Sequence, residues 1–173
     1  RISRDLRPGV LDDLGLGPAL KALVEDFGAR TGIETEFTTV VFRNRLHNDA
    51  KIGLYRIAQE ALTNVERHSG ATRVEMDLRG HRSGATLKIH DNGRGLPPHA
   101  DEARGMGLRN MQERVDQMGG TLHISGQRSG PDHGTRIEVT VPLSKVIDAA
   151  SPDLDGQDRP MRPQSPDATK DTA

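Results

Sequence analysis

Two spacings of apolar residues alternate along the chain, and together they predict the order of its helices and strands. Spacings of three or four positions place side chains on one face of an α-helix, whereas strict alternation is typical of a half-buried strand. Helical spacing predicts helices over about residues 18–30, 48–68 and 108–118. Alternation predicts strands over about residues 33–41, 74–78, 86–89, 121–125 and 135–141. This order predicts an α+β fold, a sandwich with helices on one face of a mostly antiparallel sheet.

Glycine, proline and capping residues predict the limits of these elements. Pro8 and Gly9 stop a polar helix at the start of the chain, and Asn48 is a candidate N-cap. Residues 91–107 are rich in Gly and Pro, and loops longer than ~12 residues are usually functional or disordered. Pro, Asp, Gln, Ser and Thr dominate the C-terminal segment. We therefore expect a helix end and linker over 1–10, one folded domain over 11–145 and a disordered tail over 146–173.

Composition excludes several classes of function. Aromatic residues make up only 2% of the chain, so the core must consist of aliphatic side chains. The net charge of -1 and the absence of a long basic run argue against a nucleic-acid partner. Without cysteine there is no disulfide, thiolate chemistry or Cys-based zinc site. No apolar run approaches the ~20 residues of a membrane helix, and the chain opens on a charged segment without Met. We therefore expect a cytoplasmic fragment of a longer protein.

The first candidate site lies on the second predicted helix. Glu60, Asn64 and His68 are four residues apart, so a continuous α-helix places them on one face. An amide oxygen is a suitable ligand for Mg²⁺, and a carboxylate can orient metal-bound water or accept a proton. This stripe could therefore hold a hydrated Mg²⁺ and the phosphates beside it. A solvated polar helix face would give the same pattern.

The second candidate site follows a predicted strand directly. Asp91 ends the strand, and Gly93 and Gly95 follow within four residues. A carboxylate in this setting can point into a pocket and accept a hydrogen bond from an amino group such as N6 of adenine. Asn-Gly at 92–93 also favours a hairpin turn. The long loop that follows, in place of a returning strand, weakens that alternative.

Two further segments carry weaker signals. Gly105 and Gly107 stand where the long loop meets a helix, and glycine together with free helix amides can approach a phosphate closely. The spacing superficially resembles a dinucleotide-binding fingerprint, but no strand precedes it and Asn110 replaces the third glycine. An ordinary helix start explains it equally well. Thr135 opens the last strand, where its hydroxyl could reach a ligand beside Asp91, although most such threonines do not.

Together, and in this order, the four segments resemble the N, G1, G2 and final Gly-Thr boxes of the GHKL ATPases, which include gyrase-type, chaperone-type, MutL-type and histidine-kinase ATPases. The resemblance covers about residues 6–141. Residues 55–65, Tyr-Arg-Ile-Ala-Gln-Glu-Ala-Leu-Thr-Asn-Val, and 107–115, Gly-Leu-Arg-Asn-Met-Gln-Glu-Arg-Val, are similar to sensor histidine kinases that partner nitrate- and desaturase-type response regulators. The resemblance implies a Bergerat-type two-layer sandwich. It also implies that 1–10 ends a dimerisation hairpin and that 11–145 is the ATP-binding catalytic domain.

The resemblance also implies roles for individual residues. Asn64 would ligate Mg²⁺ and Glu60 would support the metal shell, and Asp91 would bind adenine. The ATP-binding residues that it implies are Asn64, His68, Asp91, Asn92, Gly93, Gly95, Gly105, Met106, Gly107, Leu108 and Thr135. His68 and Asn92 would lie near the phosphates, Gly93 and Gly95 would shape the pocket, and Gly105 and Gly107 would anchor a closing lid. Arg94 or Arg104 would stabilise phosphate charge. The insertion at 130–133 would lengthen a hairpin without touching the site.

In this family the phosphate acceptor is a His followed by an acidic residue on an upstream helix, and none of the seven His has that setting. The resemblance therefore implies a kinase domain that binds ATP and Mg²⁺ and phosphorylates a dimerisation domain lying elsewhere, for relay to a response regulator. The full-length protein would be a homodimer and the isolated domain a monomer. It would be cytoplasmic, either free or as part of a membrane-bound sensor. The alternatives are an anti-sigma-factor type serine kinase on the same fold and a non-catalytic nucleotide-binding regulatory module.

Overall fold

A computed structural model describes residues 15–40, 46–96, 106–130 and 132–143 of the chain. The elements, in order, are α2 (Leu16–Thr31), β1 (Glu34–Val40), α3 (Asn48–Asn64), the π-helical turn η1 (Val65–Ser69), β2 (Arg73–His81), β3 (Gly84–Asp91), α4 (Met106–Gln117), β4 (Thr121–Gln127) and β5 (Gly134–Pro142). The helix predicted over 1–10, the tail over 146–173, and Gly105 and Arg104 lie outside the described residues.

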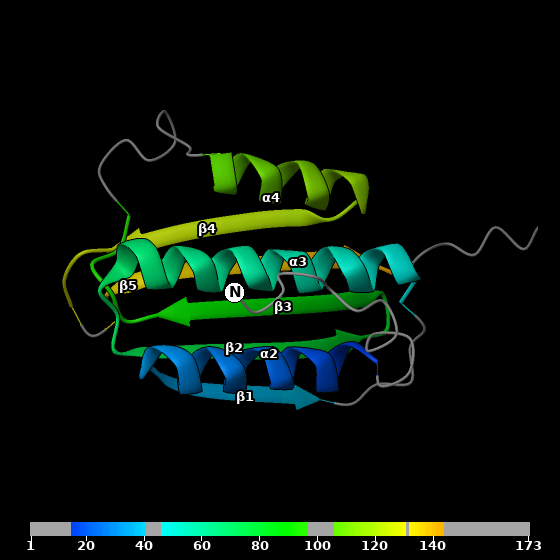
Figure 1. Cartoon of the computed structure of the whole chain (residues 1–173). Helices are drawn as coiled ribbons and strands as arrows, with labels where there is room; N and C mark the ends of the chain where they lie inside the picture. Colours follow the sequence, from blue (N-terminus) through cyan, green and yellow to red (C-terminus); the bar gives the residue numbers. More distant parts are fainter. Residues whose placement is uncertain (1–14, 41–45, 97–105, 131, 144–173) are drawn as a thin grey trace, which may run out of the picture.

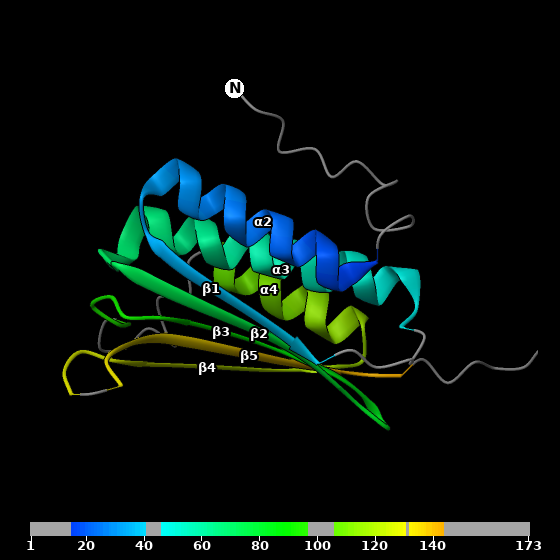
Figure 2. The same ribbon diagram turned by 90° about the horizontal axis from the view of Figure 1, so that it is seen from below.

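The described elements form two layers. The five strands make one sheet in the order β1-β2-β3-β5-β4, in which β1 runs parallel to β2 and the other neighbours are antiparallel (Figure 1). The helices α2, α3 and α4 all cover the same face of this sheet, as the turned view shows (Figure 2). The α+β sandwich predicted from the sequence is confirmed.

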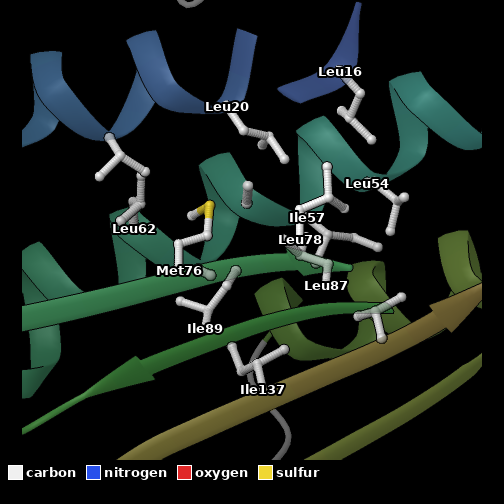
Figure 3. Close-up of a cluster of buried hydrophobic side chains, with 14 of the residues drawn as sticks. Leu16, Leu20, Leu54, Ile57, Leu62, Met76, Leu78, Leu87, Ile89 and Ile137 are labelled. Carbon is white, nitrogen blue, oxygen red and sulfur yellow. The ribbon is translucent and has the colours of Figure 1, made fainter. Parts of the chain in front are cut away.

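The core between the layers is almost entirely aliphatic. Leu20 from α2 and Leu54 and Ile57 from α3 are completely buried, and they face Met76 and Leu87 from the sheet (Figure 3). The opposite face of the sheet is polar, with the Lys88 ammonium 3.1 Å from the Glu138 carboxylate across neighbouring strands. One apolar and one polar face of the sheet explain the alternation in its sequence.

The ends of the elements differ slightly from those that the sequence predicts. Asn48 is not the N-cap of α3: it is the first helical residue, and His47 precedes it with its Nδ1 accepting the Asp49 N–H at 3.4 Å. Helix α2 ends at Gly32 in the left-handed region, where φ is 73° and its N–H donates to Gly28 O. No helix within the described ranges is long and apolar enough to cross a lipid bilayer.

Two apolar residues on α3 test the orientation of this helix. Leu54 is fully buried and Ile52 is 42% exposed, two positions away. We expect Leu54→Ala to lower the free energy of unfolding by about 2–5 kcal/mol, because the truncation leaves a cavity in the core. Ile52→Ala is the matched control and should cost less than about 1 kcal/mol. Urea denaturation measures both changes, and equal losses would contradict the orientation of α3.

Candidate functional site

A cavity of about 750 Å³ opens between the C-terminal half of α3, η1, the start of α4 and the adjoining ends of β3 and β5. These segments are far apart in the sequence, and the two-layer packing brings them together. The cavity therefore lies at one end of the sandwich, between the helical layer and the sheet. The residues that line it and that the sequence singled out are Glu60, Asn64, His68, Asp91, Arg94, Gly95, Met106, Gly107, Leu108 and Thr135.

Helix α3 and η1 form the helical wall of the cavity. Glu60 and Asn64 are separated by one α-helical turn and both line it. His68 also lines the cavity, although the helix widens to a π-turn after Asn64. Ser69, the last residue of this turn, lines it as well.

The sheet contributes a buried carboxylate to the opposite wall. Asp91 is the last residue of β3 and is only 4% exposed. Its Oδ1 accepts the N–H of Gly93 at 2.8 Å, and within the described residues no other group bonds to this carboxylate. Thr135 pairs with Asp91 in the β3–β5 ladder and also lines the cavity. Asp91 therefore retains acceptor capacity for a donor that enters the cavity.

Close backbone approach around this carboxylate requires glycine at Gly134. Its φ is 114°, and a Cβ added there would lie 1.7 Å from the carbonyl oxygen of Asp91. Neither the torsion nor the contact tolerates a side chain. The Gly-Thr pair at the start of β5 is thus a packing requirement for the strand end that carries Asp91.

The start of α4 lies against the helical wall. A Cβ on Gly107 would come within 2.3 Å of Glu60 Oε1 and 3.5 Å of Asn64 Nδ2. The first turn of α4 therefore approaches the two polar residues of α3 directly. Met106, which opens α4, is 80% exposed although it lines the cavity. This end of the cavity is consequently more open to solvent than the end at Asp91.

The structure does not bring Asn92 to the cavity wall. Its Oδ1 accepts the N–H groups of Thr72 and Arg73, both at 2.9 Å, and its Nδ2 donates to Thr72 Oγ1. The amide is thus used to hold the turn before β2, which corrects the expectation that it lies near phosphates. Gly93 does not line the cavity either, but packs beneath it against Ser69.

Several residues that line the cavity were not predicted from the sequence. Ile89 and Ile137 give the sheet wall an apolar patch beside Asp91, and Arg67 and Arg128 lie on the rim with Arg94. Arg67 and Arg94 are both exposed and form no ion pair with any described residue. Arg67 could have been predicted as a lining residue, because it is adjacent in the sequence to His68. Arg128 lies in the β4–β5 hairpin, which therefore reaches the site, whereas the described residues Gly130, Asp132 and His133 do not line the cavity.

The donor groups of the helical wall suit a hydrated magnesium ion. The described residues include no group of three or more His, Asp or Glu side chains that could hold a metal by themselves. Mg²⁺ keeps several waters and is usually held by one or two protein oxygens together with substrate phosphates. A single carboxylate, Glu60, and a single amide, Asn64, beside an open end of the cavity match that requirement.

Comparison with known proteins agrees with this geometry. Residues 49–145 match the family described as histidine kinase-, DNA gyrase B-, and HSP90-like ATPase. The match covers more than half of the chain, so the chain belongs to this family, and membership implies nucleotide binding. The site is accordingly that of a nucleotide-binding ATPase domain.

Individual relatives are sensor kinases. The chain is 46% identical over 133 residues to the sensor histidine kinase MctS of Rhizobium johnstonii, covering 75% of this chain and 29% of that protein. It is 37% identical over 144 residues to the signal transduction histidine-protein kinase/phosphatase DegS of Brevibacillus brevis, covering 83% and 36%. Among solved structures, mycobacterial sensor histidine kinase MprB has a TM-score of 0.57 and 26% identity, covering 72% of this chain and 92% of that chain. The chain spans about a third of the length of these curated relatives.

Two glycines of the β4–β5 hairpin test the packing around Asp91. Gly134→Ala should lower the free energy of unfolding by about 2–4 kcal/mol, because the new Cβ meets the Asp91 carbonyl at an unfavourable φ. Gly130 has a φ of 102° and no atom within 4 Å of its added Cβ, so Gly130→Ala is the matched control for strain alone. It should cost about 1–2 kcal/mol. Thermal unfolding compares the two variants. Equal losses of stability would show that the Asp91 carbonyl moves away from the new Cβ at little cost.

Proposed function

We propose that this chain is the ATP-binding catalytic domain of a two-component sensor histidine kinase. In this proposal it transfers the γ-phosphate of ATP to a histidine of a dimerisation domain elsewhere in the longer protein, for relay to a response regulator. The observation that carries the proposal is that one cavity is lined both by the buried Asp91 and by Glu60 and Asn64. A nucleotide needs these two chemistries, an acceptor for its base and a metal-binding wall for its phosphates.

The environment of Asp91 suits adenine. The free acceptor capacity of the carboxylate matches the N6 amino group, which donates hydrogen bonds. Ile89 and Ile137 offer apolar surface to the plane of the base, and the Thr135 hydroxyl stands beside the carboxylate in the ladder. Guanine carries a carbonyl at the position of the adenine amino group, so a carboxylate here disfavours GTP.

The helical wall and the rim suit the phosphates. Asn64 would hold Mg²⁺ and Glu60 would orient its water ligands, and the ion when bound neutralises charge on the transferring phosphoryl group. Arg67, Arg94 and His68 line the same cavity and add positive charge or hydrogen-bond donors around the phosphates. The first turn of α4, at Met106, Gly107 and Leu108, would close over them, since helix N-termini favour anions. Positioning and charge neutralisation by these groups supply the catalysis of phosphoryl transfer.

The finer assignment is to the sensor kinases that partner nitrate- and desaturase-type response regulators. The motif at 55–65 supports it, as does similarity over most of the chain to MctS and DegS. In this assignment the partners are the dimerisation and phosphoacceptor domain and a cognate response regulator. The longer protein is a homodimer with this domain in the cytoplasm.

Nucleotide titration tests the two ends of the site separately. Asp91→Asn should weaken ATP binding at least about tenfold and narrow the preference for ATP over GTP, because an amide can donate to the guanine carbonyl. Asn64→Ala should lose mainly the Mg²⁺-dependent part of the affinity. Isothermal titration calorimetry with and without Mg²⁺ measures both effects. Asp77→Asn, on the polar face of the sheet, is the control and should bind like the unaltered chain.

These outcomes have clear opposites. If Asp91→Asn and Asn64→Ala proteins remain folded and bind Mg²⁺–ATP normally, the assignment of the site is wrong. If the Mg²⁺ dependence changed in the Asp91 variant and not in the Asn64 variant, the nucleotide would bind in the opposite orientation.

Phosphotransfer tests the proposed reaction itself. We expect the chain, mixed with Mg²⁺–ATP and the dimerisation domain of a related sensor kinase, to deliver phosphate to a histidine. Phosphohistidine is acid-labile and phosphoserine is acid-stable, so acid treatment of the labelled product distinguishes a histidine kinase from a serine kinase. The Asn64→Ala protein is the negative control. Tight ATP binding without any transfer, even to a dimerisation domain covalently joined upstream of the chain, would favour a non-catalytic regulatory module.

A further inference from the structure

The π-turn at the end of α3 needs an explanation, because wide helical turns are rare and occur mostly at functional sites. Helix α3 does not stop at Asn64 but continues as η1 over Val65–Ser69 and ends at Gly70 in the left-handed region. The side chain of Ser69, its last residue, ties this turn to the segment that follows it.

Ser69 is only 8% exposed, and its hydroxyl makes two hydrogen bonds. Its Oγ donates to the Val65 carbonyl at 2.7 Å and accepts the Ala71 N–H at 2.9 Å. The hydroxyl thus links the last turn of the helix to the segment that leads into β2.

The backbone of Ser69 packs against the loop that orients Asp91. The Ser69 carbonyl accepts the Arg94 N–H at 2.9 Å. A Cβ on Gly93 would lie 2.5 Å from that carbonyl oxygen and 2.8 Å from Asp91 Oδ1, so Gly93 fills the space between the two residues. Gly93 N–H in turn donates to Asp91 Oδ1 at 2.8 Å. A displacement of Ser69 would therefore shift Gly93 and, with it, the Asp91 carboxylate.

We propose that Ser69 is a positioning residue for the base of the bound nucleotide. Its hydroxyl anchors the end of the π-turn, this anchoring places the Ser69 carbonyl, and that carbonyl with Gly93 holds the Asp91 carboxylate in its orientation. This inference rests on the proposed function, because it assumes that Asp91 binds the base. Ser69 acts through Asp91 and needs no contact with the nucleotide.

The chain contains a matched control for this role. Thr31, at the end of α2, has the same pair of bonds: Oγ1 donates to the carbonyl four residues back, Phe27, at 2.7 Å and accepts the N–H two residues on, Ile33, at 3.3 Å. Thr31 does not line the cavity. Thr31→Ala therefore removes the same two bonds from a helix end that is not joined to Asp91. Thr31 also shows that a threonine hydroxyl can make this pattern, so Ser69→Thr is the conservative variant.

The experiment compares ATP and ADP binding by calorimetry, with and without Mg²⁺, in the Ser69→Ala, Ser69→Thr and Thr31→Ala proteins. We expect Ser69→Ala to weaken ATP and ADP by the same factor, about fivefold or more, since one hydrogen-bonded anchor of the base site is lost. The ratio of affinities with and without Mg²⁺ should not change. Ser69→Thr should restore binding. Both alanine variants should lose a few degrees of melting temperature, but Thr31→Ala should bind like the unaltered chain.

Each contrary result is distinct. If Ser69→Ala binds both nucleotides as Thr31→Ala does, while Asp91→Asn weakens them, the role of Ser69 is refuted and the proposed function stands. A loss confined to the Mg²⁺-dependent affinity would also refute it, because the effect would then lie at the phosphates. If the unaltered chain binds no adenine nucleotide, the proposed function and this inference both fail.

Discussion

The burial of the Asp91 carboxylate is the constraint on which the rest of the site depends. An ionisable group that is 4% exposed must have hydrogen-bond partners or a ligand, since burial without them is costly. The strand end supplies one partner, the Gly93 N–H, and leaves acceptor capacity facing the cavity. The backbone packs so closely around this strand end that positions Gly93 and Gly134 have no room for a side chain. Gly93 and Gly134 are therefore explained by the close packing around the strand end that carries Asp91.

The aliphatic core positions the other wall against this carboxylate. Large rings are few in the core, and the helices pack closely: a Cβ on Gly53 of α3 would meet Met118 Sδ at 2.3 Å. This contact just beyond the end of α4 fixes the distance between α3 and α4. At the other end of α4 the same close packing brings Gly107 against Glu60. Close packing at both ends of α4 thus keeps this helix near the polar residues of α3.

Much of this could be predicted from the sequence, because apolar periodicity reports which face of each element is buried. Helix and strand order, the two-layer class and most lining residues followed from spacing and from the family resemblance. The errors arose where local hydrogen bonds override the average geometry. A four-residue stripe assumes α-helical turns, whereas the helix continues as a π-turn after Asn64, and Ser69 lines the cavity in addition to His68. Asn92 directly follows Asp91, which lines the cavity, yet its side-chain amide forms hydrogen bonds with Thr72 and Arg73 instead. Neither the π-turn nor the direction of the Asn92 side chain can be predicted from the spacing of residues alone.

The two ends of the cavity differ in exposure, and this difference suits the proposed reaction, in which the acceptor histidine lies on another domain. At the base end Asp91 is enclosed by strands and glycines, whereas at the other end Met106 is 80% exposed. An enclosed base end gives selectivity and fixes the nucleotide, because its contacts exclude water. An open phosphate end lets a histidine on another domain approach the γ-phosphate in line, which a closed pocket would prevent. In the proposed reaction the arginines on the rim, Arg67 and Arg94, then neutralise charge without blocking that approach, since both are exposed and neither is paired with any described residue.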